Sequence, residues 1–161
     1  MIVKVLKLIF ASTLMMLVLT GSVFAADQIN TLERSGLFGY KPGGTAVRGY
    51  DTVAYFTLGR PVEGSDKYTT EWSGALWKFS SQEHLDLFVA EPEKHAPQYG
   101  GYCAYGVAVG SLVKIEPELW TILDGKLYLN YNDKFNNKWK QDISGYIALA
   151  DSKFESLLEE K

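Results

Sequence analysis

The apolar positions of this chain first gather in one run near its start. Lys4 and Lys7 precede the apolar stretch Leu8–Leu19. A short segment that ends in the small residue Ala25 follows this stretch. This order of basic, apolar and small residues is typical of a secretory signal peptide, and the run is shorter than the roughly 20 residues of a membrane-spanning helix. We therefore expect residues 1–25 to be removed. The remaining chain is then periplasmic or secreted and not an integral membrane protein.

Two later segments have the pattern of β-hairpins. Threonine and aromatic residues flank Ser73-Gly74, and apolar residues flank Asp124-Gly125. Two-residue turns of this kind join antiparallel strands, and Asp-Gly is the strongest short-range signal for them. The predicted strands are Lys67–Trp72 with Ala75–Phe79, and Leu119–Leu123 with Lys126–Asn130.

A helix is predicted directly after the first hairpin. Ser80 or Ser81 can act as its N-cap, and Pro92 ends it. Apolar residues follow at helical spacing and predict the buried stripe of this helix: Leu85, Phe88 and Val89.

Two more helices are predicted after the second hairpin, over Lys134–Trp139 and Ile143–Leu158. The apolar positions of the longer helix recur every three or four residues and so share one face. They are Tyr146, Ile147, Ala150, Phe154 and Leu157.

The remaining segments complete the predicted domain. Residues 26–45 are polar and glycine-rich and predict a flexible N-terminal arm. Asp51 is a candidate N-cap for a short helical turn. The uncharged run Gln98–Gly110 consists of tyrosines and small residues, which is typical of a buried segment. We expect one small α+β domain over 46–161, with short β-hairpins, one central helix, C-terminal helices and no internal repeat.

Composition and charge exclude several classes of protein. The chain of 161 residues carries a net charge of −3, which becomes −5 without Lys4 and Lys7. An acidic chain has no basic surplus to neutralise phosphates, which argues against nucleic acid as a partner. A single cysteine cannot form a disulfide within the chain. All three methionines precede residue 26, so the mature chain has no methionine-rich surface for Cu(I).

Few side chains are candidates for metal binding. His84, His95 and Cys103 supply three nitrogen or sulfur ligands, the number that a catalytic zinc site takes from its protein. Their spacing matches no standard zinc finger. As a metal site the signal is weak, and the alternative is that both histidines are ordinary polar residues on or beside a helix.

Cys103 allows a second interpretation. With a histidine and Asp51 it would supply a nucleophile, a base and an orienting group, because a thiolate is reactive only when a base or cation lowers its pKa. A small cysteine in a tyrosine, glycine and alanine run also suits a packed core. A third alternative is a homodimer linked through Cys103. We assign no residue a catalytic role.

The aromatic content of the chain has two explanations. It holds 4 tryptophans, 10 tyrosines and 8 phenylalanines, and such rings can fill a core without methionine. They can also line a ligand pocket with apolar walls and hydroxyl groups. The candidate pocket residues are Asp51, Tyr99, Tyr102 and Tyr105, with Tyr128 and Tyr131 beside them.

The order of several motifs resembles a known family. It includes Gly49–Phe56 (GYDTVAYF), Trp77–Ser81 (WKFSS), Glu91–Lys94 (EPEK) and Pro97–Ala104 (PQYGGYCA). From about Ala46 to Leu149 the chain resembles exported bacterial proteins with a YHS domain.

The resemblance implies a treble-clef-like core and a metal-binding function based on cysteines. In this chain Ala54, Ser80 and His84 stand at those cysteine positions, and only His84 retains a ligand group. The resemblance implies a non-catalytic binding or accessory module for a metal ion, a metallocofactor or a protein partner. Copper and a haem-like group are the candidate cofactors. The alternative is a thiol-dependent redox protein or enzyme that uses Cys103.

Overall fold

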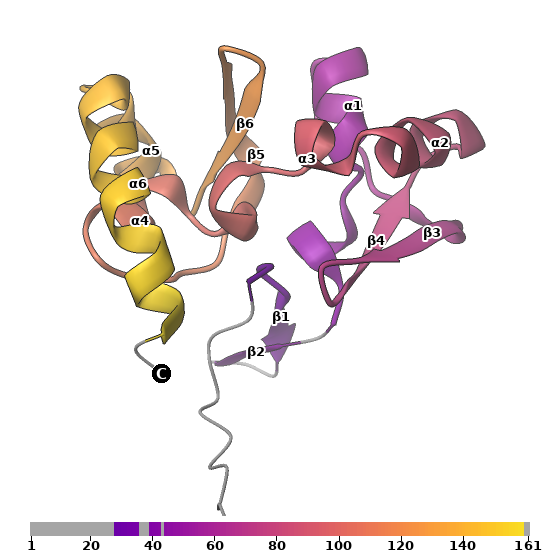
Figure 1. The fold of residues 1–161 in the computed structure, drawn as a ribbon, viewed down its shortest axis with the longest axis horizontal. Coiled ribbons are helices and arrows are strands. Elements are labelled where there is room, and N and C mark those ends of the chain that lie inside the picture. The colour runs from indigo at the N-terminus through magenta and orange to yellow at the C-terminus, as the bar shows by residue number, and fades with distance from the viewer. Residues whose placement is uncertain (1–27, 36–38, 43, 160–161) are drawn as a thin grey trace, which may run out of the picture.

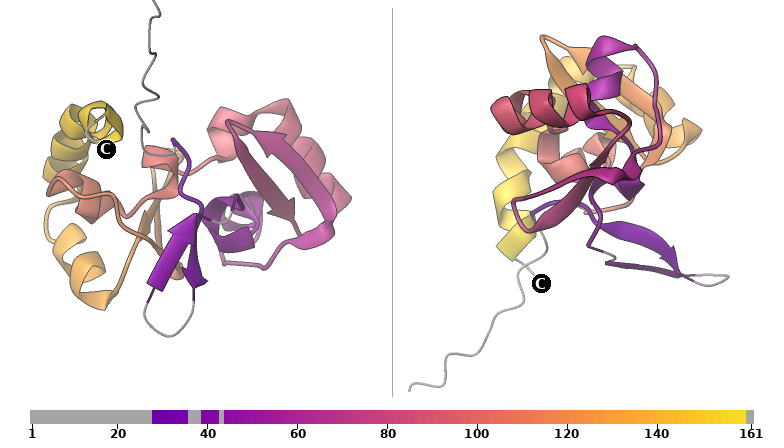
Figure 2. Two further views of the ribbon diagram at one scale, coloured as in Figure 1. Left: turned by 90° about the horizontal axis from the view of Figure 1, so that it is seen from below. Right: turned by 90° about the vertical axis from the view of Figure 1, so that its right-hand side faces the viewer.

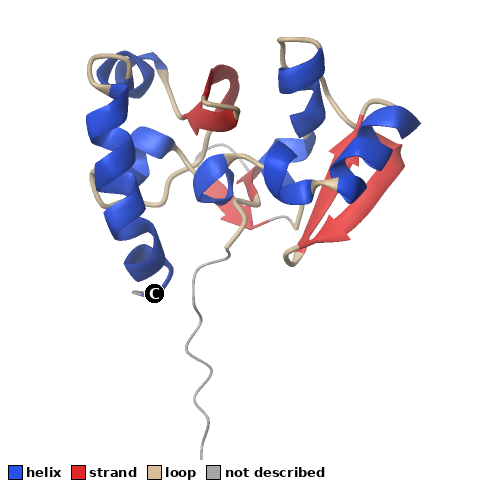
Figure 3. Cartoon of the chain, turned by 45° about the horizontal axis from the view of Figure 1, so that its top comes forward, coloured by secondary structure: helices blue, strands red, loops and turns tan. Residues whose placement is uncertain are grey.

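A computed structural model describes residues 28–35, 39–42 and 44–159. Within these ranges helices alternate with three two-stranded antiparallel sheets, which confirms a small α+β fold. Figure 3 shows the short strands set among the helices. The predicted signal peptide lies outside the described residues.

The first half of the domain, residues 46–90, combines one hairpin with short helices on the same side of the molecule (Figure 1). Asp51 caps α1 and Ser81 caps α2, so both predicted caps are confirmed. The elements are η1 (Ala46–Gly49), α1 (Thr52–Thr57), β3 (Ser65–Trp72), β4 (Ala75–Phe79) and α2 (Gln82–Ala90).

The second half, residues 98–139, follows the short connecting helix α3 (Pro92–His95). Its elements are η2 (Gln98–Gly101), α4 (Ala104–Ala108), β5 (Glu116–Leu123), β6 (Lys126–Asn130) and α5 (Asp133–Trp139). The long helix α6 (Ile143–Glu159) then packs along α4, as Figure 1 and the left view of Figure 2 show.

The two halves repeat the same order of elements. Each has a left-handed turn, a short helix, a hairpin and a second helix. The paired strands match in length and register: Trp72 pairs with Ala75, and 51 residues later Leu123 pairs with Lys126. Both ladders are irregular at the same place, just before Thr69 and Trp120. The expectation of no internal repeat is therefore wrong for the structure, although the two halves share few identical residues.

The turns of the two hairpins have the same unusual backbone. Ser73 and Gly74 both have positive φ, as do Asp124 and Gly125. This is the two-residue turn whose twist matches the twist of its strands. Both predicted hairpins are confirmed, and each first strand extends further toward its N-terminus than the sequence pattern indicated.

The left-handed turns η1 and η2 also correspond. Val47 and Arg48 have φ of 49° and 55°, and Tyr99 and Gly100 have φ of 55° and 59°. A β-branched residue rarely adopts this conformation, so Val47 is held there by its surroundings. It is fully buried in the core of the first half.

The chain before the first half joins the two turns. The backbone N–H of Asn30 donates to the carbonyl of Gly100, and its side-chain amide donates to the carbonyl of Gly101. The carbonyl of Asn30 accepts from the N–H of Val47. Ile29 and Thr31 on either side are buried. The N-terminal arm expected over 26–45 thus contains an anchored segment at 28–31, followed by the hairpin β1 (Leu32–Ser35) and β2 (Gly39–Pro42).

Two aromatic clusters form the core. The first includes the space between the β3–β4 hairpin and α2, where Phe88 contacts Trp77 and Phe79, and it continues to Cys103 and Leu129 of the second half. The second lies under α6 and contains the five predicted apolar residues of that helix, which confirms its buried face. Tyr55 of α1 connects the halves, because its hydroxyl donates to the carbonyl of Pro117 and its ring packs on Trp120.

One part of the predicted pattern is wrong. Val89 was expected on the buried stripe of α2, yet its side chain is 59% exposed. His84 is buried instead, one helical turn before Phe88, so the buried stripe of α2 begins with a histidine. No helix in the described ranges has the length and hydropathy needed to cross a membrane.

Candidate functional site

Asp51 is the most heavily hydrogen-bonded side chain of the first half. It is fully buried at the N-terminus of α1. Its Oδ1 accepts from the backbone N–H groups of Val53 and Ala54 at 3.0 and 3.2 Å. A side-chain oxygen at this position satisfies the N–H groups that a helix leaves without partners.

The second oxygen of Asp51 reaches the other elements of this half. Oδ2 accepts from the backbone N–H and the hydroxyl of Ser80, at 2.9 and 2.6 Å. It also lies 2.6 Å from Nδ1 of His84. Five donors therefore surround one carboxylate, which joins the end of β4 and the first turn of α2 to α1. Such saturation suits an ionised carboxylate, whose two oxygens offer about four acceptor positions.

His84 extends this network toward the surface. Its ring is 9% exposed, and its Nε2 lies 3.0 Å from the Thr57 hydroxyl. Thr57 lies at the end of α1 and is exposed to solvent. Asp51, His84 and Thr57 thus form a continuous polar path from the core to the surface.

His95 lies on α3, beside α1. The residue is 5% exposed, and its ring packs edge-on against Phe56 with 5.6 Å between ring centres. Nδ1 lies 3.0 Å from the carbonyl oxygen of Glu91 and donates to it. Burial lowers the pKa of His95 and favours the neutral ring. Within the described ranges Nε2 of His95 has no hydrogen-bond partner.

Cys103 occupies the position in the second half that Asp51 occupies in the first. It caps α4, and its Sγ accepts from the N–H of Gly106 at 3.3 Å. The thiol donates to Oδ1 of Asn130 at 3.5 Å. Cys103 is fully buried, and burial raises the pKa of its thiol. The lowered pKa that the nucleophile interpretation of Cys103 requires is not found, because the sulfur lies inside the core where the thiolate would lose its hydration.

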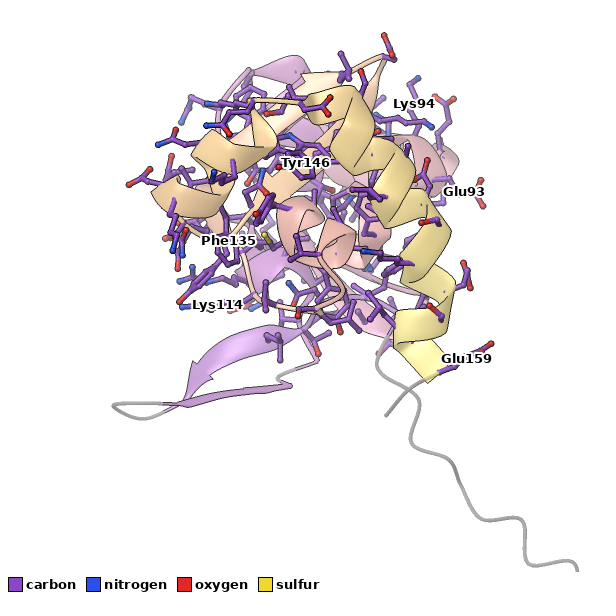
Figure 4. All side chains as sticks on the ribbon, turned by 90° about the vertical axis from the view of Figure 1, so that its left-hand side faces the viewer. Glu93, Lys94, Lys114, Phe135, Tyr146 and Glu159 are labelled. Atoms are coloured by element: carbon purple, nitrogen blue, oxygen red, sulfur yellow. The ribbon has the colours of Figure 1, made fainter. Side chains whose placement is uncertain are left out.

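The candidate pocket tyrosines pack in the core. The Tyr99 hydroxyl donates to Asp151 at 2.8 Å, and burial together with this hydrogen bond raises its pKa. Tyr105 contacts the rings of Phe135 and Tyr146, which come from α5 and α6 (Figure 4). Tyr102 is also buried.

Tyr99, Tyr102, Tyr105 and Tyr128 therefore contribute to the second aromatic cluster, which does not include Asp51. Tyr128 stacks between Tyr99 and Trp139, and Tyr131 packs on Phe135. The pocket of Asp51 with Tyr99, Tyr102 and Tyr105 does not form. The alternative explanation, in which aromatic rings fill the core, accounts for their placement.

The three candidate metal ligands do not form one site. Across the described part of the chain, no three His, Cys, Asp or Glu side chains have an arrangement that could hold a metal ion. Both ring nitrogens of His84 already have partners, and Cys103 is enclosed in the second half. The expected site of His84, His95 and Cys103 is therefore wrong, because the fold directs each group to a different set of neighbours.

Sequence reasoning missed Thr57 and the role of Ser80. Thr57 lies 27 residues from its partner His84, and Ser80 lies 29 residues from its partner Asp51. The available signal was the helical spacing of His84 and Phe88, which places the histidine on the buried side of α2.

Comparison with family models, with curated proteins and with solved structures finds no match for this chain.

Proposed function

We propose that this protein is an exported binding or accessory module of the YHS kind, and that His95 is its contact with a metallocofactor. The observation that carries this proposal is the state of the His95 ring. One nitrogen is anchored on the Glu91 carbonyl, burial favours the neutral form, and the other nitrogen has no partner among the described residues. A histidine that ligates a metal usually has its other ring nitrogen held in this way.

The ligand must bring most of its own coordination. A copper ion held by His84, His95 and Cys103 does not fit the structure, since these groups do not meet. A haem-like group needs only one or two axial protein ligands and supplies the other donor atoms itself. The imidazole of His95 on α3, whose Nε2 has no partner among the described residues, can supply one such ligand.

Titration with haemin tests the proposal. We expect the absorption band of haemin to shift when it binds the wild-type protein. His95→Asn should bind haemin with an affinity about 10-fold to 100-fold lower. Loss of a residue that merely supports a metal ligand already lowers affinity by this range. Asparagine keeps a donor near the position of Nδ1 and removes Nε2. Cys103→Ala is the matched control and should bind as the wild type does. Equal affinity of wild type and His95→Asn would overturn the assignment.

Export is tested separately. Expression of the full chain in a bacterium with a periplasm should yield a protein whose N-terminus is Ala26 in the periplasmic fraction. Retention of residues 1–25 would contradict the proposed signal peptide.

The thiol-dependent alternative has less support. Cys103 is buried and its pKa is raised, so neither thiolate chemistry nor a linked homodimer is favoured. Under native conditions we expect a thiol reagent to modify Cys103 about 100-fold more slowly than in urea, because access requires local opening. Rapid native labelling would restore this alternative.

A further inference from the structure

The path from Asp51 to Thr57 has the arrangement of a nucleophile, a base and an orienting group. The Thr57 hydroxyl lies 3.0 Å from Nε2 of His84, and Nδ1 of His84 lies 2.6 Å from Asp51. These distances are within the range in which a base accepts a proton from a hydroxyl. Asp51 is itself held by the backbone N–H groups of Val53 and Ser80. Its fixed carboxylate therefore fixes the orientation of the His84 ring.

The hydrogen-bond roles follow from the carboxylate. An ionised Asp51 only accepts, so Nδ1 of His84 carries a proton and donates to Oδ2. The lone pair of Nε2 is then available to the Thr57 hydroxyl. That hydroxyl has one proton and two acceptors within reach, Nε2 of His84 and the carbonyl of Val53 at 3.1 Å.

The surroundings of Thr57 are exposed and partly apolar. Leu58 follows it directly and is 50% exposed. Leu87 lies on α2 one helical turn after His84 and is 37% exposed. Exposed leucine side chains thus follow both Thr57 and His84 closely along the chain, which suits an apolar acyl chain.

The second half shows that the fold does not need this arrangement. Positions 52 or 51 residues later carry Cys103 for Asp51, Val109 for Thr57 and Phe135 for His84. Val109 is exposed like Thr57, and Phe135 packs on Tyr105 and Tyr131. The same elements with the same register thus form without a base or a hydroxyl. The triad of the first half is an addition to the shared architecture.

We propose that Asp51, His84 and Thr57 form an acyl-accepting site that is specific for activated esters with an apolar acyl chain. Oγ1 of Thr57 attacks the ester carbonyl, and Nε2 of His84 takes the hydroxyl proton. The bond from the acyl carbon to the leaving oxygen breaks, and the leaving group departs with its electron pair and receives the proton from His84. The products are an acyl ester on Thr57 and the free alcohol. Asp51 acts as a positioning residue and exchanges no proton.

The test uses p-nitrophenyl butyrate as the probe. The purified protein should release p-nitrophenol in a burst and gain one butyryl group, which peptide mass spectrometry should place on Thr57. Thr57→Val introduces the residue found at the corresponding exposed position of the second half, Val109. It should abolish this modification. Thr57→Ser keeps the hydroxyl and should retain it.

Two further variants examine the base and its support. His84→Gln should slow acylation about 100-fold or more, the usual contribution of a general base. Ser80→Ala removes one donor to Asp51 and should slow acylation less while Thr57 stays the modified residue. Circular dichroism confirms that each variant is folded.

Butyryl groups found only on lysines, or an unchanged rate in Thr57→Val, would overturn the proposal. These two results remain decisive if His84→Gln does not fold, because Thr57 is exposed and its replacement leaves the core intact. The outcome is independent of haemin binding at His95.

Discussion

The two halves of this domain share a backbone and differ in the chemistry at its centre. In the first half the cap of the short helix is a carboxylate that binds the next hairpin and a histidine. In the second half the cap is a thiol, which contacts the neutral amide of Asn130. Both groups satisfy backbone N–H donors at a helix start, so the fold accepts either. The difference teaches that the hydrogen bond between Asp51 and His84 is not a requirement of this arrangement of elements.

The strongest way to break the comparison is to remove each cap. Asp51→Ala should lower the free energy of unfolding by about 4 kcal/mol, because it removes the partner of buried donors and leaves His84 without its carboxylate. Cys103→Ala should cost about 1 to 2 kcal/mol, since the thiol caps weakly and fills little volume. Urea unfolding followed by tryptophan fluorescence measures both values. Equal losses of unfolding free energy would contradict the larger contribution expected from Asp51.

A second comparison concerns the left-handed turns. Arg48 in η1 carries a side chain, whereas a Cβ at its counterpart Gly100 would lie 1.8 Å from the carbonyl oxygen of Gln28. Gly100→Ala should therefore lower the free energy of unfolding by about 3 kcal/mol, from positive φ and from displacement of the N-terminal segment.

Gly125→Ala is the matched control, because Gly125 also has positive φ but open space around it. It should cost about 1 kcal/mol. A difference between the two glycines measures the contact with Gln28, and equal costs would contradict a role for that segment in joining the halves.

His95, on the helix α3 that connects the halves, should make the unfolding free energy depend on pH. The pKa of His95 is lowered from its ordinary value of 6.5, chiefly by burial. The unfolded chain therefore takes up a proton first as the pH falls, and stability that is present above about pH 6.5 is lost below it. We expect the unfolding free energy of the wild type to decrease on acidification more steeply than that of His95→Asn. Parallel curves for the two proteins would contradict the burial of a neutral ring.

The smallest effect is expected at the exposed end of α2. Val89→Lys copies the residue at the corresponding position of the second half, Lys140, and removes an exposed apolar side chain. The free energy of unfolding should change by less than about 0.5 kcal/mol. A loss of several kcal/mol in thermal or urea unfolding would show that Val89 is buried after all.

Most elements of the fold were predictable because their signals are local. The dipeptides Ser73-Gly74 and Asp124-Gly125 indicated both hairpins, and Asp51 and Ser81 were correctly placed as caps. The buried face of α2 was harder to predict, because its first buried residue is His84 and a histidine is not counted as apolar in the pattern. The repeat of the halves was not visible, because corresponding positions keep their conformations while most of their residues differ.

The candidate site was only partly predictable. The sequence suggested that Asp51 and a histidine act together, but it gave them Cys103 as the nucleophile and did not decide between His84 and His95. Their contact spans 33 residues, and the contact of His84 with Thr57 spans 27. Nothing local specifies which distant polar groups meet, so the spacing left both a metal site and a reactive thiol open.

By itself the sequence determined where the chain turns, where helices begin and which faces are apolar, because these properties follow from neighbours within a few residues. Tertiary structure decided which polar groups became partners. It buried Cys103 against Asn130, left Nε2 of His95 without a partner among the described residues, and set His84 between Asp51 and Thr57. A buried polar group must find its partner from whatever the packing brings near, and that choice is made only when the whole chain folds.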